Sequence, residues 1–171
     1  IISKEKEIPS IKENENAVII VNQTPFYGES GGQIGDSGTI SNDNFIFKVE
    51  DTTKLFGNYF LHWGRVIKGQ CSINEEVLLS IDVKKRELVK NNHSATHLLH
   101  ASLKKILGTY VSQKGSLVSS EKLRFDFSYN QPIESNKLDK IEKLVNNIIQ
   151  QNSQVQISIL DYDTAVKGGA T

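Results

Sequence analysis

Residues Asp82–Gly108, DVKKRELVKNNHSATHLLHASLKKILG, mark the point at which the sequence changes from a β pattern to a helical one. Apolar side chains recur here at helical spacing, at Leu88, Val89, Leu98, Leu99, Leu103, Ile106 and Leu107. A glycine, Gly108, follows the last of them, where glycine commonly ends a helix. We therefore predict a helix from about Asp82 to Gly108, which the Asn91-Asn92 pair could interrupt or restart.

The sequence before this segment is typical of short antiparallel strands. Apolar or alternating runs occur at Ala17–Asn22, Asn44–Val49, Tyr59–Ile67 and Val77–Val83. Turn-forming residues separate the later runs, at 55–58 and 68–70. Several short strands at this spacing predict a small antiparallel β-barrel or sandwich.

The sequence after Gly108 predicts a hairpin, a second helix and a last strand. The hairpin strands are expected at Tyr110–Val118 and Lys122–Ser128, and the helix from about Ser135. The last strand is expected at Val155–Leu160, with Asp161 or Asp163 capping whatever follows. The fold class is thus α+β: a β-barrel over 1–83, then an α+β core over 84–171 made of helix, hairpin, helix and strand.

Composition excludes several classes of protein. The 171 residues hold one cysteine, Cys71, so no disulfide framework forms within the chain. No apolar run approaches the roughly 20 residues that span a bilayer, and the N-terminal residues do not form a secretory signal. A cytoplasmic setting is the default. The sequence contains no methionine, and both ends look cut, so we expect a piece of a longer protein.

Charge is distributed unevenly along a chain whose net charge is zero. Between Lys84 and Arg124 there are nine Lys or Arg residues and two acids, Glu87 and Glu121, which gives this segment a charge of +7. Such an asymmetry indicates a surface that faces a polyanion. The alternative is a set of solvated helix faces that contact no partner.

Three of the four histidines lie in NNHSATHLLH, residues 91–100. His93 and His97 are four residues apart, so a helix projects their rings from one face, as a metal site requires. His100 lies nearly two turns from His93, and we expect it to make a structural hydrogen bond. Zinc peptidases need a glutamate at the position of Ser94, which disfavours peptidase chemistry. Cys71 is interpreted as a small apolar residue at a strand edge rather than a ligand.

A second segment, 22–39, is NQTPFYGESGGQIGDSGT and holds five glycines. Glycines allow the backbone to approach a ligand closely. The segment is neither a Walker A loop nor a dinucleotide-binding fingerprint, because both required patterns are missing. An irregular hairpin with bulges explains the glycines equally well.

Together these segments resemble a known family. TPFYGESGGQIGDSG (24–38) and NHSATHLLHASLKKILGTYVSQKGSLV (92–118) are similar to the editing domain of alanyl-tRNA synthetases. The wider group includes free-standing alanyl-tRNA editing proteins and the editing domain of threonyl-tRNA synthetases. RFDFSYNQPI (124–133) and LDYDTAVKGGA (160–170) continue the resemblance over essentially the whole chain.

The resemblance implies an N-terminal β-barrel followed by an α+β editing core. It also implies a reaction, hydrolysis of the ester in tRNA(Ala) mischarged with serine or glycine. The family holds zinc with two histidines of an HxxxH motif, which correspond to His93 and His97, and with a downstream Cys-x-x-x-His. That second pair has no counterpart before Thr171, so we expect the remaining ligands beyond the chain and the fragment alone to be inactive.

Other site residues follow from the same resemblance. Gln113 and Thr96 correspond to residues at the family's editing pocket, and Thr24 to a residue that reads the serine hydroxyl. The loop from Gly31 to Gly38 corresponds to a glycine-rich motif near the substrate. No Ser-His-Asp arrangement is evident, and the chemistry needs a positioned water and stabilisation of the oxyanion.

The resemblance implies tRNA as the partner, with phosphate contacts from the basic segment, and it implies neither a membrane nor DNA. The enzyme containing such a domain is an alanine–tRNA ligase that uses ATP, although no residue of the ligase module lies in this chain. Two alternatives stay open: a free-standing trans-editing deacylase, and a tRNA-binding domain without hydrolytic activity.

Overall fold

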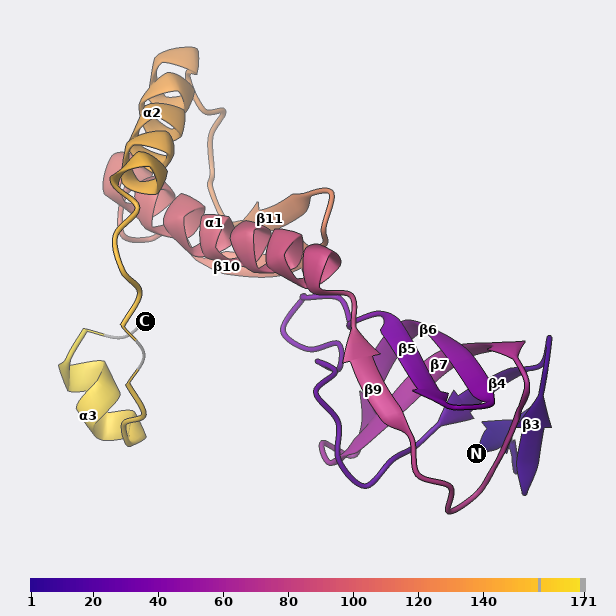
Figure 1. The fold of residues 1–171 in the computed structure, drawn as a ribbon. Helices are drawn as coiled ribbons and strands as arrows, with labels where there is room; N and C mark the ends of the chain where they lie inside the picture. Colours follow the sequence, from indigo (N-terminus) through magenta and orange to yellow (C-terminus); the bar gives the residue numbers. More distant parts are fainter. Residues whose placement is uncertain (157, 170–171) are drawn as a thin grey trace.

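The computed structural model describes residues 1–156 and 158–169, and it has a mixed α+β architecture (Figure 1). The strands before the long helix are β1 (Ile2–Ser3), β2 (Lys6–Glu7), β3 (Ser10–Lys12), β4 (Asn16–Ile19), β5 (Gly38–Asn42), β6 (Phe45–Leu55), β7 (Tyr59–Lys68), β8 (Gln70–Ser72) and β9 (Leu78–Ile81). They form the β part of the molecule. The first helix follows β9 directly and leads into an α+β part.

The β part contains a seven-stranded antiparallel sheet in the order β2-β1-β4-β7-β6-β5-β9. A separate pair, β3 and β8, covers one side of it. Within the residues that the structure describes, no sheet closes, because the edge strands β2 and β9 do not pair with each other. The expected barrel is therefore wrong: closure requires the two edges to meet, and β2 is only 2 residues long.

The core of the β part lies on one face of the sheet. Alternating side chains of β6, Phe45, Phe47 and Val49, are fully buried there, as period-2 alternation dictates. Ile40 from β5 and Val66 from β7 pack into the same cluster. The four predicted strand runs of this part are thus confirmed as β4, β6, β7 and β9.

The predicted helix is a single element, α1 (Val83–Leu107). The Asp82 side chain caps its start by accepting from Lys85 N at 3.0 Å, and Gly108 ends it as predicted. The Asn91-Asn92 pair does not interrupt the helix. Asn92 Nδ2 donates to Ser119 O at 2.8 Å, so this side chain bonds to a neighbouring element and does not compete with the helix backbone.

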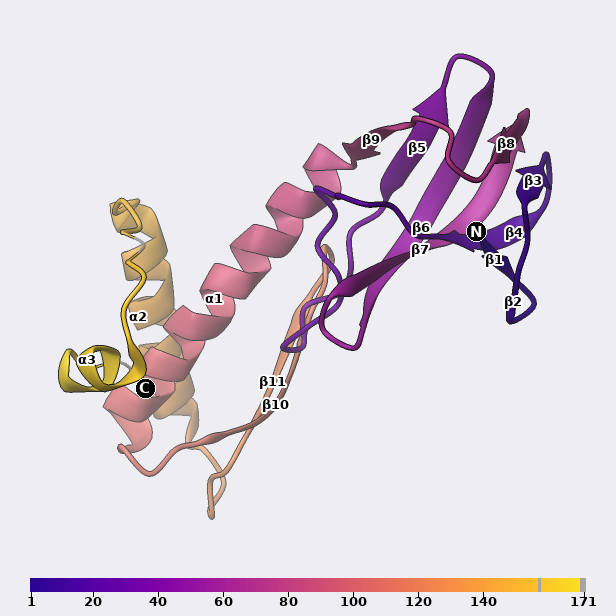
Figure 2. The same cartoon turned by 90° about the horizontal axis from the view of Figure 1, so that it is seen from below.

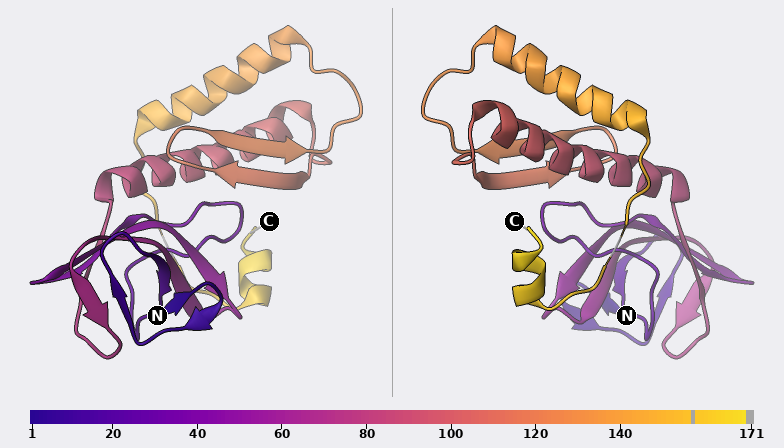
Figure 3. Two further views of the ribbon diagram at one scale, coloured as in Figure 1. Left: turned by 90° about the vertical axis from the view of Figure 1, so that its right-hand side faces the viewer. Right: turned by 90° about the vertical axis from the view of Figure 1, so that its left-hand side faces the viewer.

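The α+β part is built around α1. Its other elements are β10 (Gln113–Val118), β11 (Leu123–Phe127), α2 (Ser135–Gln151) and α3 (Tyr162–Lys167). Figures 2 and 3 show α1 between α2 on one side and the β10–β11 hairpin on the other. The hydrophobic core of this part is formed by four buried residues: Leu103 and Leu107 of α1, Val111, and Ile141 of α2.

The expected last strand is not observed. Residues 155–156 and 158–160 have no strand structure, and Ile157 lies outside the described residues. Ile159 is 98% exposed, and no neighbouring strand lies beside it in the described part of the chain. The short α3 follows, capped by Asp161, which accepts from Thr164 N at 3.0 Å as predicted. None of the described helices is both long and apolar enough to cross a membrane.

Candidate functional site

The glycine-rich loop joins the two parts of the molecule. Its backbone bonds to the last residue of β10: Ile34 N donates to Val118 O at 3.1 Å, and Val118 N donates to Gly32 O at 2.7 Å. Gly32 has φ +84°, and a Cβ there would meet the backbone of Ser116. The close approach of loop and hairpin therefore requires glycine at this position.

An ion pair ties the end of the same loop to the first turns of α1. Arg86 Nε donates to Asp36 Oδ1 at 2.8 Å, and Arg86 Nη2 donates to Asp36 Oδ2 and to Pro25 O. Tyr27 N also donates to the Asp36 carboxylate, at 2.6 Å. Lys85 Nζ adds a hydrogen bond to Ser37 Oγ at 3.1 Å. The loop is thus attached to the α+β part at two places, one on the hairpin and one on α1.

Within the first attachment, between Gly32 and Ile34, the loop contacts the first histidine of the HxxxH pair. Gln33, only 6% exposed, brings its Oε1 within 2.5 Å of His93 Nδ1. Because an amide oxygen only accepts, His93 carries its proton on Nδ1 and keeps the Nε2 lone pair free. Burial, followed by the nearby His97, lowers the pKa of His93 below its ordinary value, so the ring is neutral at pH 7.

His97 lies beside His93 as the helical spacing predicts. The two rings are stacked, with centroids 5.1 Å apart and planes at 26°, and His97 is exposed. The two imidazoles lie on one helix face, and an amide oxygen holds one of them through the nitrogen that would not bind the metal; metal-binding histidines in proteins have this arrangement.

These two residues do not make a complete metal site. Over residues 1–156 and 158–169 the structure places no group of three or more His, Cys, Asp or Glu side chains that could hold a metal. The imidazole pair therefore fits zinc in ligand type and spacing, and it supplies two donors. A closed tetrahedral site needs two more.

Other predicted residues of α1 are engaged within the fold. Thr96 is 6% exposed, and its hydroxyl donates to Asn92 O at 2.8 Å. The expected structural hydrogen bond of His100 is wrong: its ring packs on Phe125 at 5.0 Å, and its buried Nε2 has no hydrogen-bond partner among the described residues. The ring of His100 thus belongs to the interface between α1 and the hairpin.

Gln113 begins β10, at the end of the strand opposite Val118. Five residue steps of extended chain separate these two, about 17 Å. The Gln113 side chain is exposed and makes no hydrogen bond to either histidine in the described part of the chain. The structure therefore brings the glycine-rich loop to His93 and leaves Gln113 apart from that contact.

Thr24 is held by a fully buried histidine of β7. Its Oγ1 lies 2.8 Å from His62 Nε2 and accepts from Phe26 N at 3.1 Å. The opposite ring nitrogen, His62 Nδ1, lies 2.9 Å from Ile19 O. Burial lowers the pKa of His62, so its ring is neutral. The Thr24 hydroxyl thus already makes two hydrogen bonds within the β part.

Cys71 lies apart from the histidines, as predicted. It belongs to β8, is 5% exposed and packs into the core of the β part. Burial and the nearby Glu75 raise the pKa of its thiol to about 11, so it is protonated at pH 7 and suits neither metal binding nor nucleophilic attack.

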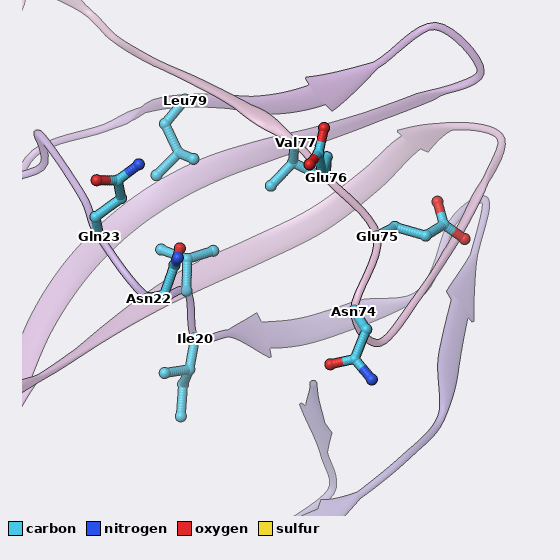
Figure 4. A pocket seen from close by; sticks show the side chains of 9 residues that line it. Ile20, Asn22, Gln23, Asn74, Glu75, Glu76, Val77 and Leu79 are labelled. Carbon is cyan, nitrogen blue, oxygen red and sulfur yellow. The ribbon is translucent and has the colours of Figure 1, made fainter.

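A cavity lies on the β part, and neither His93 nor His97 lines it. It has a volume of about 580 Å³ and opens between the end of β4 and the loop that precedes β9 (Figure 4). Its lining consists of Ile20, Val21, Asn22, Gln23, Asn74, Glu75, Glu76, Val77 and Leu79. The carboxylate of Glu75 in this lining is bonded to Asn42 Nδ2 and to Ser72 N.

Comparison with known proteins gives one family. Residues 1–85 match the family described as tRNA synthetases class II (A). The match covers 85 of the 171 residues and relates the N-terminal half of the chain to that family. The matched range covers the β part, the glycine-rich loop and the start of α1, and it ends before His93. The proteins of this family are enzymes that bind tRNA.

Three polar residues that hold the site were not identified from the sequence. Gln33 and Asp36 lie between the glycines of the glycine-rich loop. Polar residues in such a loop indicate side chains that bond to another part of the molecule, and this signal could have identified both. His62 is the one histidine outside residues 91–100, and apolar residues surround it in the sequence of β7. Its role depends on Thr24, which lies 38 residues earlier in the chain, so no local sequence pattern indicates the pairing.

Proposed function

We propose that this chain is the editing domain of an alanyl-tRNA synthetase, and that it hydrolyses the ester of tRNA(Ala) mischarged with serine or glycine. The observation that carries the proposal is the contact between Gln33 and His93. It joins the segment that matches the synthetase family to the HxxxH pair beyond it. The glycine-rich loop and the two histidines therefore form one site.

The proposed chemistry needs little from the protein. An aminoacyl ester is already activated, so its hydrolysis requires a positioned water and stabilisation of the negative charge that develops on the carbonyl oxygen. In this proposal the glycine-rich loop positions the ester next to α1. Thr96 supports the helix there through its bond to Asn92 O, and Gln113 reaches the substrate from the hairpin only if the bound tRNA extends along β10.

We propose zinc as the cofactor, held by His93 and His97 together with ligands from outside the described residues. When bound, zinc supplies a Lewis acid that polarises a carbonyl or lowers the pKa of a water. Gln33 holds His93 in the tautomer that leaves Nε2 for the metal. With two ligands of four, the 171-residue chain should retain well under one zinc per molecule after dialysis. Stoichiometric zinc that survives dialysis contradicts this half-site.

The basic segment 84–124 is the proposed tRNA surface, but part of its charge is neutralised within the fold. Arg86 pairs with Asp36, Lys90 with Glu87, and Arg124 with Asp126. The basic residues without an ion pair among the described side chains are Lys84, Lys85, Lys104, Lys105, Lys114 and Lys122. These residues extend along the length of α1 and onto the hairpin, and they are the proposed phosphate contacts.

The experiment that tests the function measures hydrolysis of seryl-, glycyl- and alanyl-tRNA(Ala) by the full-length gene product containing this sequence. We expect the seryl and glycyl esters to be hydrolysed and the alanyl ester to be spared. His97→Ala should abolish hydrolysis, whereas Ser94→Ala, on an exposed neighbouring position of the same helix, should leave it unchanged.

Two other outcomes separate the alternatives. If the full-length gene product lacks a ligase module and still hydrolyses the seryl and glycyl esters, the protein is a free-standing trans-editing deacylase. Tight tRNA binding with no hydrolysis of any ester, by wild type as by His97→Ala, identifies a tRNA-binding domain and contradicts the editing proposal.

A further inference from the structure

A chain of hydrogen bonds runs from the backbone of β4 to the hydroxyl of Thr24, and each of its protons is determined. His62 is 0% exposed, and its Nδ1 lies 2.9 Å from the carbonyl oxygen of Ile19. A carbonyl oxygen only accepts, so Nδ1 carries the hydrogen. The ring is neutral because it is buried away from any carboxylate partner, so Nε2 has a lone pair and no hydrogen.

This tautomer dictates the direction of the next bond. His62 Nε2 can only accept, and Thr24 Oγ1, 2.8 Å away, must donate to it. A hydroxyl has one hydrogen and two lone pairs. One lone pair of Thr24 accepts from Phe26 N at 3.1 Å. The hydroxyl can therefore make one further hydrogen bond, and only as an acceptor through its second lone pair.

We infer that His62 is a positioning residue that makes the Thr24 hydroxyl an obligate hydrogen-bond acceptor toward a ligand. The inference rests on the proposed editing function, in which Thr24 meets the side chain of the misacylated amino acid. Thr24 is half-buried and His62 is not accessible at all, so only Thr24 can contact that side chain. An acceptor with a fixed hydrogen recognises a side chain that donates.

The chemistry of the amino acids follows from this. The hydroxyl of serine donates to the remaining lone pair, and the methyl of alanine cannot. A freely rotating hydroxyl would turn its hydrogen toward ligand or solvent and would recognise acceptors as well. The buried imidazole removes that freedom, and it does so with a group whose own orientation is fixed by the Ile19 carbonyl.

Thr24 is also anchored relative to the rest of the site. The next residue, Pro25, accepts from Arg86 Nη2 at 3.1 Å, which links this end of the loop to the first turns of α1. His93 lies seven residues further along the same helix, about 10 Å along its axis. The acceptor and the histidine pair therefore belong to one rigid arrangement of loop and helix.

The first experiment needs no variant. The ¹⁵N shifts of the His62 ring in the labelled 171-residue chain should show a neutral imidazole protonated on Nδ1 near pH 7. A ring protonated on Nε2, or a charged ring, overturns the inference, because Thr24 would then accept from His62 and keep its hydrogen for the ligand.

The second experiment compares two esters with the full-length gene product: seryl-tRNA(Ala) and 3-fluoroalanyl-tRNA(Ala), which is similar in size and has no donor. Wild type should hydrolyse the seryl ester at least about fivefold faster, the value of one hydrogen bond. His62→Leu should reduce this ratio, and His62→Gln, whose amide oxygen can accept from Thr24, should restore most of it. Thr24→Ser should keep the ratio, since it retains the hydroxyl.

The outcomes separate the inference from the proposed function. If wild type hydrolyses both esters at the same rate, or if His62→Leu keeps the full ratio while folding as wild type by circular dichroism, His62 does not select the substrate. If wild type hydrolyses neither ester, the editing function fails and the selecting role of His62 fails with it. Should His62→Leu not fold, the ring tautomer and His62→Gln still decide the question.

Discussion

At the scale of single residues, buried polar side chains hold the exposed ones that we place at the site. Gln33 orients His93, and His62 orients Thr24. In both pairs a residue nearly without solvent access fixes the proton of a residue that a ligand or metal can reach. The consequence is that conservative changes at the buried partner should alter specificity or affinity without touching any ligand.

The burial of His62 predicts how stability depends on pH. Its pKa in the folded state lies below its ordinary value of 6.5, which the unfolded chain retains. The unfolded state therefore takes up a proton first as pH falls. The contribution of the neutral His62 ring to the free energy of unfolding is therefore complete above about pH 6.5. It is lost as the pH falls toward the pKa of the folded state, and the free energy of unfolding changes by up to about 1.4 kcal/mol per pH unit in that range.

Urea unfolding of the 171-residue chain between about pH 5 and 7.5 measures this slope. His93 contributes in the same direction, because its pKa is also lowered. His62→Leu should remove the contribution of His62 and leave that of His93. An identical slope in wild type and His62→Leu means that His62 is not protonated on unfolding in this range.

At the scale of elements, the glycine-rich loop is the connection between the β part and the α+β part. Two glycines in it offer a matched comparison. Gly31 and Gly32 both have positive φ, +59° and +84°, but a Cβ at Gly31 meets nothing within 4 Å, whereas one at Gly32 meets the Ser116 backbone.

Gly32→Ala should therefore destabilise the chain by roughly 3 kcal/mol, from backbone strain and from the collision with the hairpin. Gly31→Ala carries only the backbone strain and should cost about 1 kcal/mol. Chemical denaturation gives both free energies of unfolding. Equal costs for the two variants would show that the loop can move away from β10 without loss.

The second attachment of the loop is the pair of Arg86 and Asp36. The Asp36 side chain is 7% exposed and accepts from Arg86 and from the backbone of Tyr27. Arg86→Met leaves that carboxylate buried without its cation, and it should cost about 3 kcal/mol of unfolding free energy. Arg124→Met, which breaks an exposed pair with Asp126, should cost less than about 1 kcal/mol. Similar losses for both variants would contradict the role of the Arg86 pair as a buried clamp.

At the scale of the whole molecule, the β part faces α1 through the glycine-rich loop (Figure 3). The lysines of the segment 84–124 that have no ion pair among the described side chains belong to α1, the hairpin and its turn. Changing Lys104, Lys105 and Lys114 together to alanine should weaken tRNA binding. The slope of log K against log salt should fall by about 0.9 for each lost contact with duplex phosphate. Fluorescence titration of the full-length gene product with tRNA(Ala) at several salt concentrations measures both quantities.

The control removes the same charge elsewhere. Lys4, Lys6 and Lys12 are exposed on the β part, far from α1 in sequence. Their joint change to alanine should leave the salt dependence nearly unaltered. If both triple variants lower the slope equally, the binding surface extends over the β part and is not confined to the segment 84–124.

Much of the local structure can be predicted from the sequence alone. Helical spacing and the glycine at position 108 predicted α1, alternation predicted the main strands, and the HxxxH spacing placed His93 beside His97. These features depend on neighbours within a few residues, so they can be read along the chain. Even so, the expected strand at 155–160 was not observed, because a strand also needs a partner that no local pattern supplies.

The contacts between distant segments, in contrast, depend on the three-dimensional packing of the chain. Whether a sheet closes depends on its two edges, and here the short β2 and β9 remain unpaired with each other in the described part. The bonds from Gln33 to His93 and from Thr24 to His62 join residues 60 and 38 positions apart. Such contacts are set by packing of whole elements, and no spacing rule within either segment encodes them. The protons that those bonds fix are therefore a property of the fold.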